Sequence, residues 1–214
     1  MDVKRHSPAE TGASALADTR SRQASTRVSD DVLLDAAKKC VLAVGVRRTT
    51  LAEIARTAKV SRMTVYRRFP DVRSVLATLM TREFGGLLQG AAEPGEEPAT
   101  HRERLVKASA AAVSALSNDP LFRTLLDLDP ELVLPYIVER LGKTQRFAEG
   151  VILHLLKGGH EDGSIRKGDL PAQARTLLLL IQSFAFSLRP ATADVNEEHL
   201  MAEFTHVLDA ALRP

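Results

Sequence analysis

The stretch from Thr49 to Phe69 constrains the fold most strongly, because its pattern predicts two short helices joined by a tight turn. Thr50 followed by Glu53 is a capping-box pattern, in which the Thr side chain accepts a hydrogen bond from an early backbone N–H and the Glu side chain reaches back to the cap. Apolar residues behind this cap recur at helical spacing and give the first helix one apolar face. They are Leu51, Ile54, Ala55 and Ala58.

The second helix of this stretch begins after Ser61, which is a second N-cap residue. Val65 and Phe69 place apolar side chains one helical turn apart, so this helix also has an inward face. The connection between the two helices leaves room only for a turn of three or four residues, with Val60 pointing inward. This pattern is typical of a helix-turn-helix, whose second helix lies in the major groove of DNA.

Long, basic or hydrogen-bonding side chains cover the second helix, and no acid lies between Arg56 and Phe69. Arg can make two hydrogen bonds to guanine, whereas Thr and Met can touch a thymine methyl group. Tyr and Thr hydroxyls can donate to phosphates, which sets the register without reading bases. A solvated basic face on an ordinary helical hairpin is the alternative, but caps, turn and charge together favour DNA. The predicted DNA-binding residues are Thr50, Ser61, Arg62, Met63, Thr64, Tyr66, Arg67 and Arg68.

This ordered pattern resembles the tetracycline-repressor (TetR) family of bacterial regulators. The resemblance covers roughly residues 28–80 and is carried by Leu33–Ala37, Gly45, Thr49–Ala55, Ala58–Ser61, Thr64–Phe69 and Val75–Leu76. It implies a three-helix DNA-binding head, a helical body that binds a small-molecule inducer, and assembly as a dimer.

Three positions depart from the family's pattern. Lys59 stands where the family usually has Gly, so a non-glycine residue is expected at positive φ. Met63 replaces another common Gly and adds bulk to the DNA-facing helix. Val72 occupies the position of the usual phosphate-contacting Lys, and its neighbour Arg73 can partly replace that contact, which adds Arg73 to the predicted DNA-binding residues.

The charge of the chain is unevenly distributed. Residues 20–90 contain 14 Lys and Arg against 6 Asp and Glu, whereas residues 91–214 contain 13 against 18. The asymmetry suits a basic DNA-binding head joined to a body that does not bind DNA. Because 44% of the residues are hydrophobic, with abundant Ala and Leu and few β-branched runs, the sequence favours an all-α fold.

We expect about nine helices and no strand, in three parts. Residues 1–27 form a disordered basic arm, which either reaches into a minor groove or is a plain tail. Residues 28–80 form the helix-turn-helix domain, and residues 81–214 form the ligand-binding and dimerisation domain. Asp119-Pro120 and Asp129-Pro130 each predict an N-cap followed by Pro at the first helical position. Pro135 either kinks the long helix expected over 130–157 or defers its start.

The single cysteine, Cys40, excludes an intrachain disulfide, fits a reducing cytoplasm and is expected to be a buried structural thiol. The first 27 residues lack the apolar segment of a signal peptide. The longest apolar run, Leu177 to Leu188, is interrupted and too short to cross a bilayer. We therefore expect a soluble, cytoplasmic protein without a membrane segment.

Two apolar helices near the C-terminus predict a homodimer. The run from Leu177 to Leu188 is apolar on nearly every side, which is typical of a helix buried all round. Paired across a two-fold axis with the last helix, it would match the symmetry of a palindromic operator. A purely internal core is the alternative. The predicted interface residues are Leu177, Ile181, Phe184, Ala185, Leu188, Leu200, Phe204 and Leu208.

The middle of the chain carries a few polar side chains on an apolar background, as ligand cavities do. Together with the resemblance, this pattern predicts a pocket for a small, largely apolar effector. The candidate ligand-binding residues are Phe122, Tyr136, Arg140, Thr144, Phe147 and His154.

Catalysis, a metal and a cofactor are not expected. His101, His154 and His160 lack metal-ligand spacing, and neither a nucleophile elbow nor a glycine-rich phosphate loop is present. The sequence therefore predicts a homodimeric, ligand-responsive transcription factor, most simply a repressor that binds a palindromic operator and is released by its effector. A DNA-binding regulator or architectural protein without an effector is the alternative, and ligand-dependent loss of operator binding separates the two.

Overall fold

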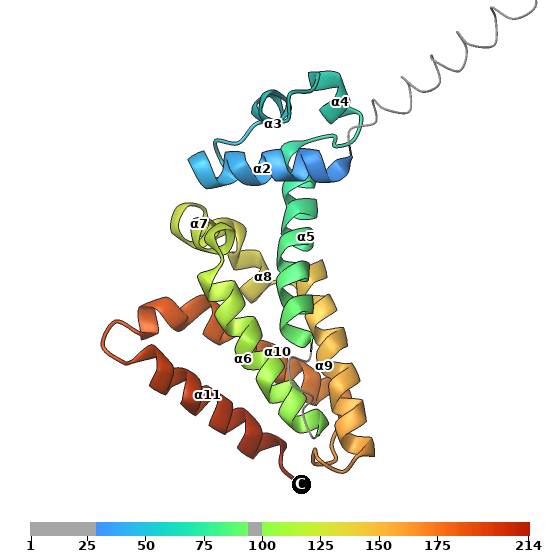
Figure 1. Cartoon of the computed structure of the whole chain (residues 1–214), viewed down its shortest axis with the longest axis vertical. Coiled ribbons are helices and arrows are strands. Elements are labelled where there is room, and N and C mark those ends of the chain that lie inside the picture. The colour runs from blue at the N-terminus through green and yellow to red at the C-terminus, as the bar shows by residue number, and fades with distance from the viewer. Residues whose placement is uncertain (1–28, 94–99) are drawn as a thin grey trace, which may run out of the picture.

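The computed structural model describes residues 29–93 and 100–214, so the arm predicted for residues 1–27 lies outside the described residues. All regular elements in the described ranges are helices, which confirms the predicted all-α fold (Figure 1). Ten are α-helices, one more than the nine expected. The elements are α2 Asp30–Val44, α3 Leu51–Thr57, α4 Arg62–Tyr66, α5 Val72–Ala92, α6 His101–Asn118, α7 Pro120–Leu128, the 3-10 turn η1 Pro130–Leu132, α8 Leu134–Val138, α9 Lys143–Glu161, α10 Leu170–Ala191 and α11 Glu197–Leu212.

Most of these helices begin at a side chain that accepts a hydrogen bond from the first turn, which satisfies one of the exposed backbone donors there. The capping residues are Ser29, Thr50, Ser61, Asp71, Thr100, Asp119, Asp169 and Asn196. Asp129 and Pro130 begin η1 at the N-cap and first positions that the sequence predicts, but the Asp129 carboxylate makes no cap bond there and accepts instead from the backbone N–H of Val46.

The additional helix comes from the segment around Pro135. The helix expected over 130–157 is interrupted, and α9 begins only at Lys143, after Gly142. Pro135 therefore defers the start of the long helix, and η1 and α8 occupy the residues before it.

The three short helices of the head pack around one core and rest on α5. Figure 1 shows α2 lying across the end of α5, with α3 and α4 beyond it. The core of the head includes Leu33, Val41, Ile54, Val65, Phe69, Val75 and Leu79.

The head and the body share this core rather than meeting at a surface. Helix α5 has 21 residues and runs without interruption through Gly85 and Gly86, so the boundary expected at residue 80 falls inside it. Phe122 of α7 joins the head's core, with its ring centroid 5.5 Å from Phe84 and 5.3 Å from Phe186. The side chains of α7 and α10 therefore help to hold the head.

Helix α6 is the centre of the body. It packs against α5, α9, α10 and α11, and Figure 1 shows α9 and α11 on its two sides. A second core fills the space between these helices, with contributions from Leu105, Val113, Leu156, Leu178 and Leu208. Within the described ranges, no helix is both long and apolar enough to cross a membrane.

The structure buries most of the residues predicted for the dimer interface. Ala185 is 5% exposed in the head's core, five others belong to the second core, and Phe184 and Leu200 pack against that core while partly buried. Side chains covered by their own chain have little surface to offer a partner, which favours the internal-core alternative for this face. The apolar side chains left uncovered are others, with Leu179 52% exposed on α10 and Val207 53% exposed on α11.

Candidate nucleic-acid interface

The predicted capping box at the start of α3 is present. Glu53 N–H donates to Thr50 Oγ1 at 3.2 Å, and Thr50 N–H donates to Glu53 Oε2 at 3.2 Å. Leu51, Ile54 and Ala55 are buried beneath it. The N-terminus of α3 is therefore fixed by its own sequence, with Thr50 at the surface.

The turn after α3 takes the conformation predicted from its departure from the family. Lys59 has φ 56°, in the left-handed region that glycine adopts most easily. Its N–H donates to Arg56 O at 3.1 Å, and Val60 N–H donates to Ala55 O at 3.0 Å. Val60 packs, partly buried, against the head's core, as its predicted inward position requires.

Helix α4 is shorter than the sequence indicates. It ends at Tyr66, although Phe69 N–H still donates to Val65 O at 2.9 Å and continues the turn. Val65 and Phe69 are both buried, and these two anchors force the opposite side of α4 outward. The exposed side chains are Arg62, Met63, Tyr66 and Arg67, with Met63 74% and Tyr66 50% exposed.

Three predicted DNA-binding side chains make contacts within the head. Arg68, which follows the end of α4, forms an ion pair with Asp30 at the start of α2, so it ties this part of the chain to α2 while remaining exposed. The hydroxyls of Ser61 and Thr64 lie 2.9 Å apart, and Ser61 also accepts from Thr64 N–H as the cap of α4. These contacts fix the position of α4, the helix that carries the exposed side chains.

The start of α5 accounts for the unusual Val72. Its side chain packs against the head's core, whereas the next residue, Arg73, is exposed. Asp71 caps α5 by accepting from Ser74 N–H at 2.7 Å. A basic side chain therefore stands one residue beyond the family's lysine position.

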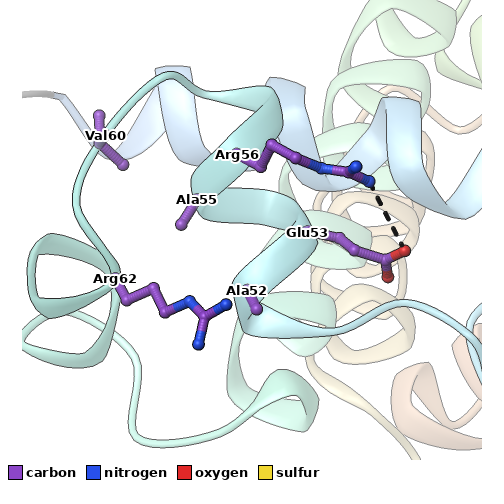
Figure 2. A pocket seen from close by; sticks show the side chains of 6 residues that line it. All are labelled: Ala52, Glu53, Ala55, Arg56, Val60 and Arg62. Atoms are coloured by element: carbon purple, nitrogen blue, oxygen red, sulfur yellow. Dashed lines mark ion pairs between the residues drawn. The ribbon is translucent and has the colours of Figure 1, made fainter.

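A surface hollow of about 570 Å³ lies between α3 and α4 (Figure 2). Figure 2 shows Arg62 extending from the start of α4 toward α3 and Arg56 pairing with Glu53 at 3.9 Å. Arg56 was not among the DNA-binding residues predicted from the sequence, although its helical position two residues after the apolar Ile54 indicates an outward side chain. The lining residues are Ala52, Glu53, Ala55, Arg56, Val60 and Arg62.

An ion-pair network fixes α2 against α5. Arg82 donates to Asp35 at 2.7 Å and Glu83 at 2.6 Å, and Lys38 donates to the other oxygen of Glu83 at 2.5 Å. Burial works to raise the pKa of Glu83, but the hydrogen bonds from Lys38 and Arg82 outweigh it and lower that pKa. Burial works to lower the pKa of Arg82, and its carboxylate partners raise it overall.

The predicted ligand-binding residues do not converge in one place. Tyr136 and Arg140 share a hollow of about 360 Å³ beside α10, where the Arg140 guanidinium lies 5.2 Å from the Tyr136 ring centroid. Phe122 is buried in the shared core, and Phe147 and His154 are exposed. Thr144 is half-buried outside the hollow's lining. The hollow is lined by Tyr136, Ile137, Val138, Glu139, Arg140, Leu141, Arg146, Arg175, Leu179 and Gln182.

Two solved structures share this fold. The transcriptional regulator FadR from Bacillus subtilis, in complex with stearoyl-CoA, aligns with a TM-score of 0.64 and 17% identity over 86% of this chain and 100% of its own. SmeT, the repressor of the Stenotrophomonas maltophilia multidrug efflux pump SmeDEF, aligns with a TM-score of 0.63 and 21% identity over 87% of this chain and 91% of its own. At these identities the likeness concerns the fold.

Sequence comparison gives information beyond the fold. The sequence model of bacterial regulatory proteins of the tetR family matches residues 33–77, which span α3, α4 and most of α2. An uncharacterized HTH-type transcriptional regulator of Mycobacterium bovis is 38% identical over 180 residues, covering 84% of this chain and 92% of that protein. The chain therefore belongs to the tetR family of bacterial regulatory proteins and is a transcriptional regulator, not an enzyme.

Proposed function

We propose that this regulator is a repressor that binds a palindromic operator as a homodimer through α3 and α4. The observation that carries the proposal is the outer face of α4, where Arg62, Met63, Tyr66 and Arg67 are exposed because Val65 and Phe69 are anchored inside. Such a face suits a major groove, in which cationic and hydrogen-bonding side chains meet base edges and phosphates. This function would place the protein in the cytoplasm.

Each exposed side chain has a distinct proposed role. Arg67 and Met63 read base edges from α4, while Thr50 and Tyr66 donate to phosphates. Arg73 contacts the backbone from the start of α5. Ser61 and Thr64 fix the start of α4, and Arg68 sets its tilt through Asp30. We further propose residues 28–80 as the DNA-binding unit and residues 81–214 as the unit for effector binding and dimerisation.

Footprinting on the DNA upstream of the protein's own coding region tests this function. We expect a protected palindrome with two half-sites about one or two helical turns apart, because two heads related by a two-fold axis meet the same face of the duplex. Uniform, salt-sensitive binding to any DNA without a protected site would favour the architectural alternative.

The dimer is proposed to form through the uncovered faces of α10 and α11, in place of the buried face chosen from the sequence. On α10 this face presents Leu179 among the exposed Thr176 and Ser183, and on α11 it presents Val207 beside Ala210. Small side chains allow two helices to approach closely, and the exposed Leu and Val supply apolar area for a second copy to cover.

The effector is proposed to enter the hollow beside α10. Apolar Ile137 and Leu179 line it together with Arg140, Arg146 and Arg175, a combination that suits an apolar molecule with an anionic group. Arg175 also pairs with Glu149 at 2.7 Å, so Arg140 and Arg146 are the better anion ligands.

The anionic apolar dye anilinonaphthalene sulfonate provides a probe for this hollow. We expect Arg140→Gln to weaken dye binding several-fold, and Arg123→Gln, which lies on α7 outside the lining, to leave it unchanged. Equal binding by both variants would place the dye elsewhere and favour a regulator without an effector at this hollow.

A further inference from the structure

Asp129 is a carboxylate buried between the body and the head. It follows the last residue of α7 and is 1% exposed. Its Oδ2 accepts a hydrogen bond of 2.6 Å from Val46 N–H in the α2–α3 loop, and its Oδ1 lies 3.7 Å from Arg47 Nε. A buried carboxylate needs donors to replace its lost hydration, and a charged acceptor makes the stronger hydrogen bond. The Asp129 side chain therefore links the body to the head's backbone.

The backbone conformation of the α2–α3 loop allows the Asp129 carboxylate to approach closely. Gly45 has φ 80°, and a Cβ built there would lie 3.1 Å from Asp129 Oδ2, so glycine permits both the left-handed turn and the close approach. Thr49 closes the loop, because its hydroxyl donates to Gly45 O at 2.8 Å and its N–H donates to Val46 O at 3.1 Å. The next residue is Thr50, which caps α3 and is a proposed phosphate contact.

The backbone of Asp129 is connected through η1 and α8 to the hollow in the body. Its carbonyl oxygen accepts from Leu132 N–H at 3.0 Å and begins η1. Helix α8 follows after one residue and supplies Tyr136, Ile137 and Val138 to the wall of the hollow. An exposed pair reinforces the joint, since Arg47 Nε donates to Glu131 Oε1 at 2.6 Å. These hydrogen bonds and the short chain segments between them thus connect the hollow's wall to the N-terminus of α3.

We propose that Asp129 is a positioning residue that holds the α2–α3 loop, and with it the start of α3, in the pose that binds DNA. Movement of η1 and α8 changes the hold of Asp129 on Val46 N–H and so changes the affinity of the head. This inference rests on the proposed function, because it names the joint through which the hollow regulates operator binding.

Substitutions at Asp129 and at a nearby aspartate separate this role from a general effect of charge. Asp127 lies two residues earlier and is half exposed. It forms a surface ion pair with Arg189, another residue of the body, at 2.8 Å. We expect Asp129→Ala to weaken operator binding about tenfold and Asp129→Asn, which keeps an acceptor for Val46 N–H, to recover most of that loss. Asp127→Ala should stay within about twofold of the wild type.

Hydrogen exchange measures the coupling itself. By reciprocity, operator DNA bound to the head should slow amide exchange in residues 131–138 of the wild-type body. In Asp129→Ala this protection should vanish, while the amides of α10 exchange as before. A carboxylate that only adds stability would leave the DNA-induced protection in place.

Three outcomes would overturn the proposal: unchanged or tighter operator binding by Asp129→Ala, no rescue by Asp129→Asn, or no DNA-induced protection of residues 131–138 in the wild type. The last needs no variant, so it holds even if Asp129→Ala does not fold. If the wild type protects no operator, the proposed function fails instead. Faster exchange of residues 46–53 in Asp129→Ala than in Asp127→Ala would then still establish Asp129 as the support of that loop.

Discussion

Helices α4 and α10 each bury one face and leave the other uncovered, but the two uncovered faces differ in chemistry. The outer face of α4 carries long cationic and hydrogen-bonding side chains, including Arg62 and Arg67. The outer face of α10 carries mostly short, neutral side chains around Leu179, including Thr176 and Ser183, with Arg175 as a cation one turn away. Long cations suit a hydrated, anionic polymer, whereas short neutral side chains suit close contact with another protein surface. The difference supports the proposal of a DNA face on α4 and an assembly face on α10.

The inner face of α10 offers the largest test of this distinction. Ala185→Glu places a carboxylate in the first core without a partner, which costs several kcal/mol. A loss of about 4 kcal/mol lowers the melting temperature by about 8–16 °C for a chain of this size. Ser187→Glu, on the exposed side of the same helix, should melt near the wild type. Circular dichroism melts measure both, and a stable Ala185→Glu variant would show that this face is not internal.

The outer face of α10 should respond differently to the same charge. Leu179→Glu is expected to remain folded, because the side chain is solvated, yet to disrupt the proposed dimer, where it would be buried without a partner. Operator affinity should fall about 100-fold, since a monomer loses the second half-site. Analytical ultracentrifugation measures the assembly, and the equivalent change at Val207 is the second probe. A dimer of unchanged affinity in both variants would move the interface to another surface.

The outer face of α4 is tested by sequence preference. Arg67→Ala should cost about 1–3 kcal/mol on the operator and relax preference at one base pair, if Arg67 reads guanine. Tyr66→Phe should weaken operator and random DNA alike, because it removes a phosphate donor. Titrations with both DNAs compare the variants, and Arg213→Ala at the far end of the body is the control. Equal losses on the two DNAs would reassign Arg67 to a phosphate contact.

The smallest effect concerns the ion-pair network of Glu83, Arg82 and Lys38, which fixes α2 of the head against α5. Because the pKa of Glu83 is lowered in the folded protein from its ordinary 4.5, its charge stabilises the fold above that pH. Glu83→Gln should therefore reduce stability by about 1 kcal/mol at pH 7. The deficit should shrink as the pH falls below 4.5 toward the folded pKa, where wild-type Glu83 is protonated. Thermal melts across this range measure it, and a deficit independent of pH would point to packing.

Much of the structure of the head could be predicted from the sequence because it depends on interactions between residues close together in the chain. The caps at Thr50 and Ser61 and the inward Val65 each depend on residues within one or two turns, whereas the positive φ of Lys59 was expected from the glycine that the family usually has there. Such short-range features survive whatever the rest of the chain does. Arg68 is the exception in α4, because its partner Asp30 lies 38 residues away and no periodicity indicates that pairing.

The helix faces that tertiary packing buries could not be predicted from the sequence in the same way. Helix α10 is apolar on nearly every side, so its pattern cannot say which side α6 and α9 will cover, and most of the residues selected for an interface lie on the covered side. A related reason applies to the predicted effector residues, since Phe122 packs in the shared core with Phe84. Asp129 read as a cap beside Pro130, and only the folded chain brings it to Val46.

The shared core also limits how this protein can be recombined. A hybrid regulator cut at residue 80 would divide α5 in mid-helix and separate the head from Phe122 and Ala185, which complete its core. The head of this chain would then present an apolar gap to whatever foreign body it joined. A hybrid protein that keeps the DNA specificity of this head must also contain α7 and the facing part of α10. The structural unit needed for DNA recognition is therefore larger than the helix-turn-helix and discontinuous in sequence.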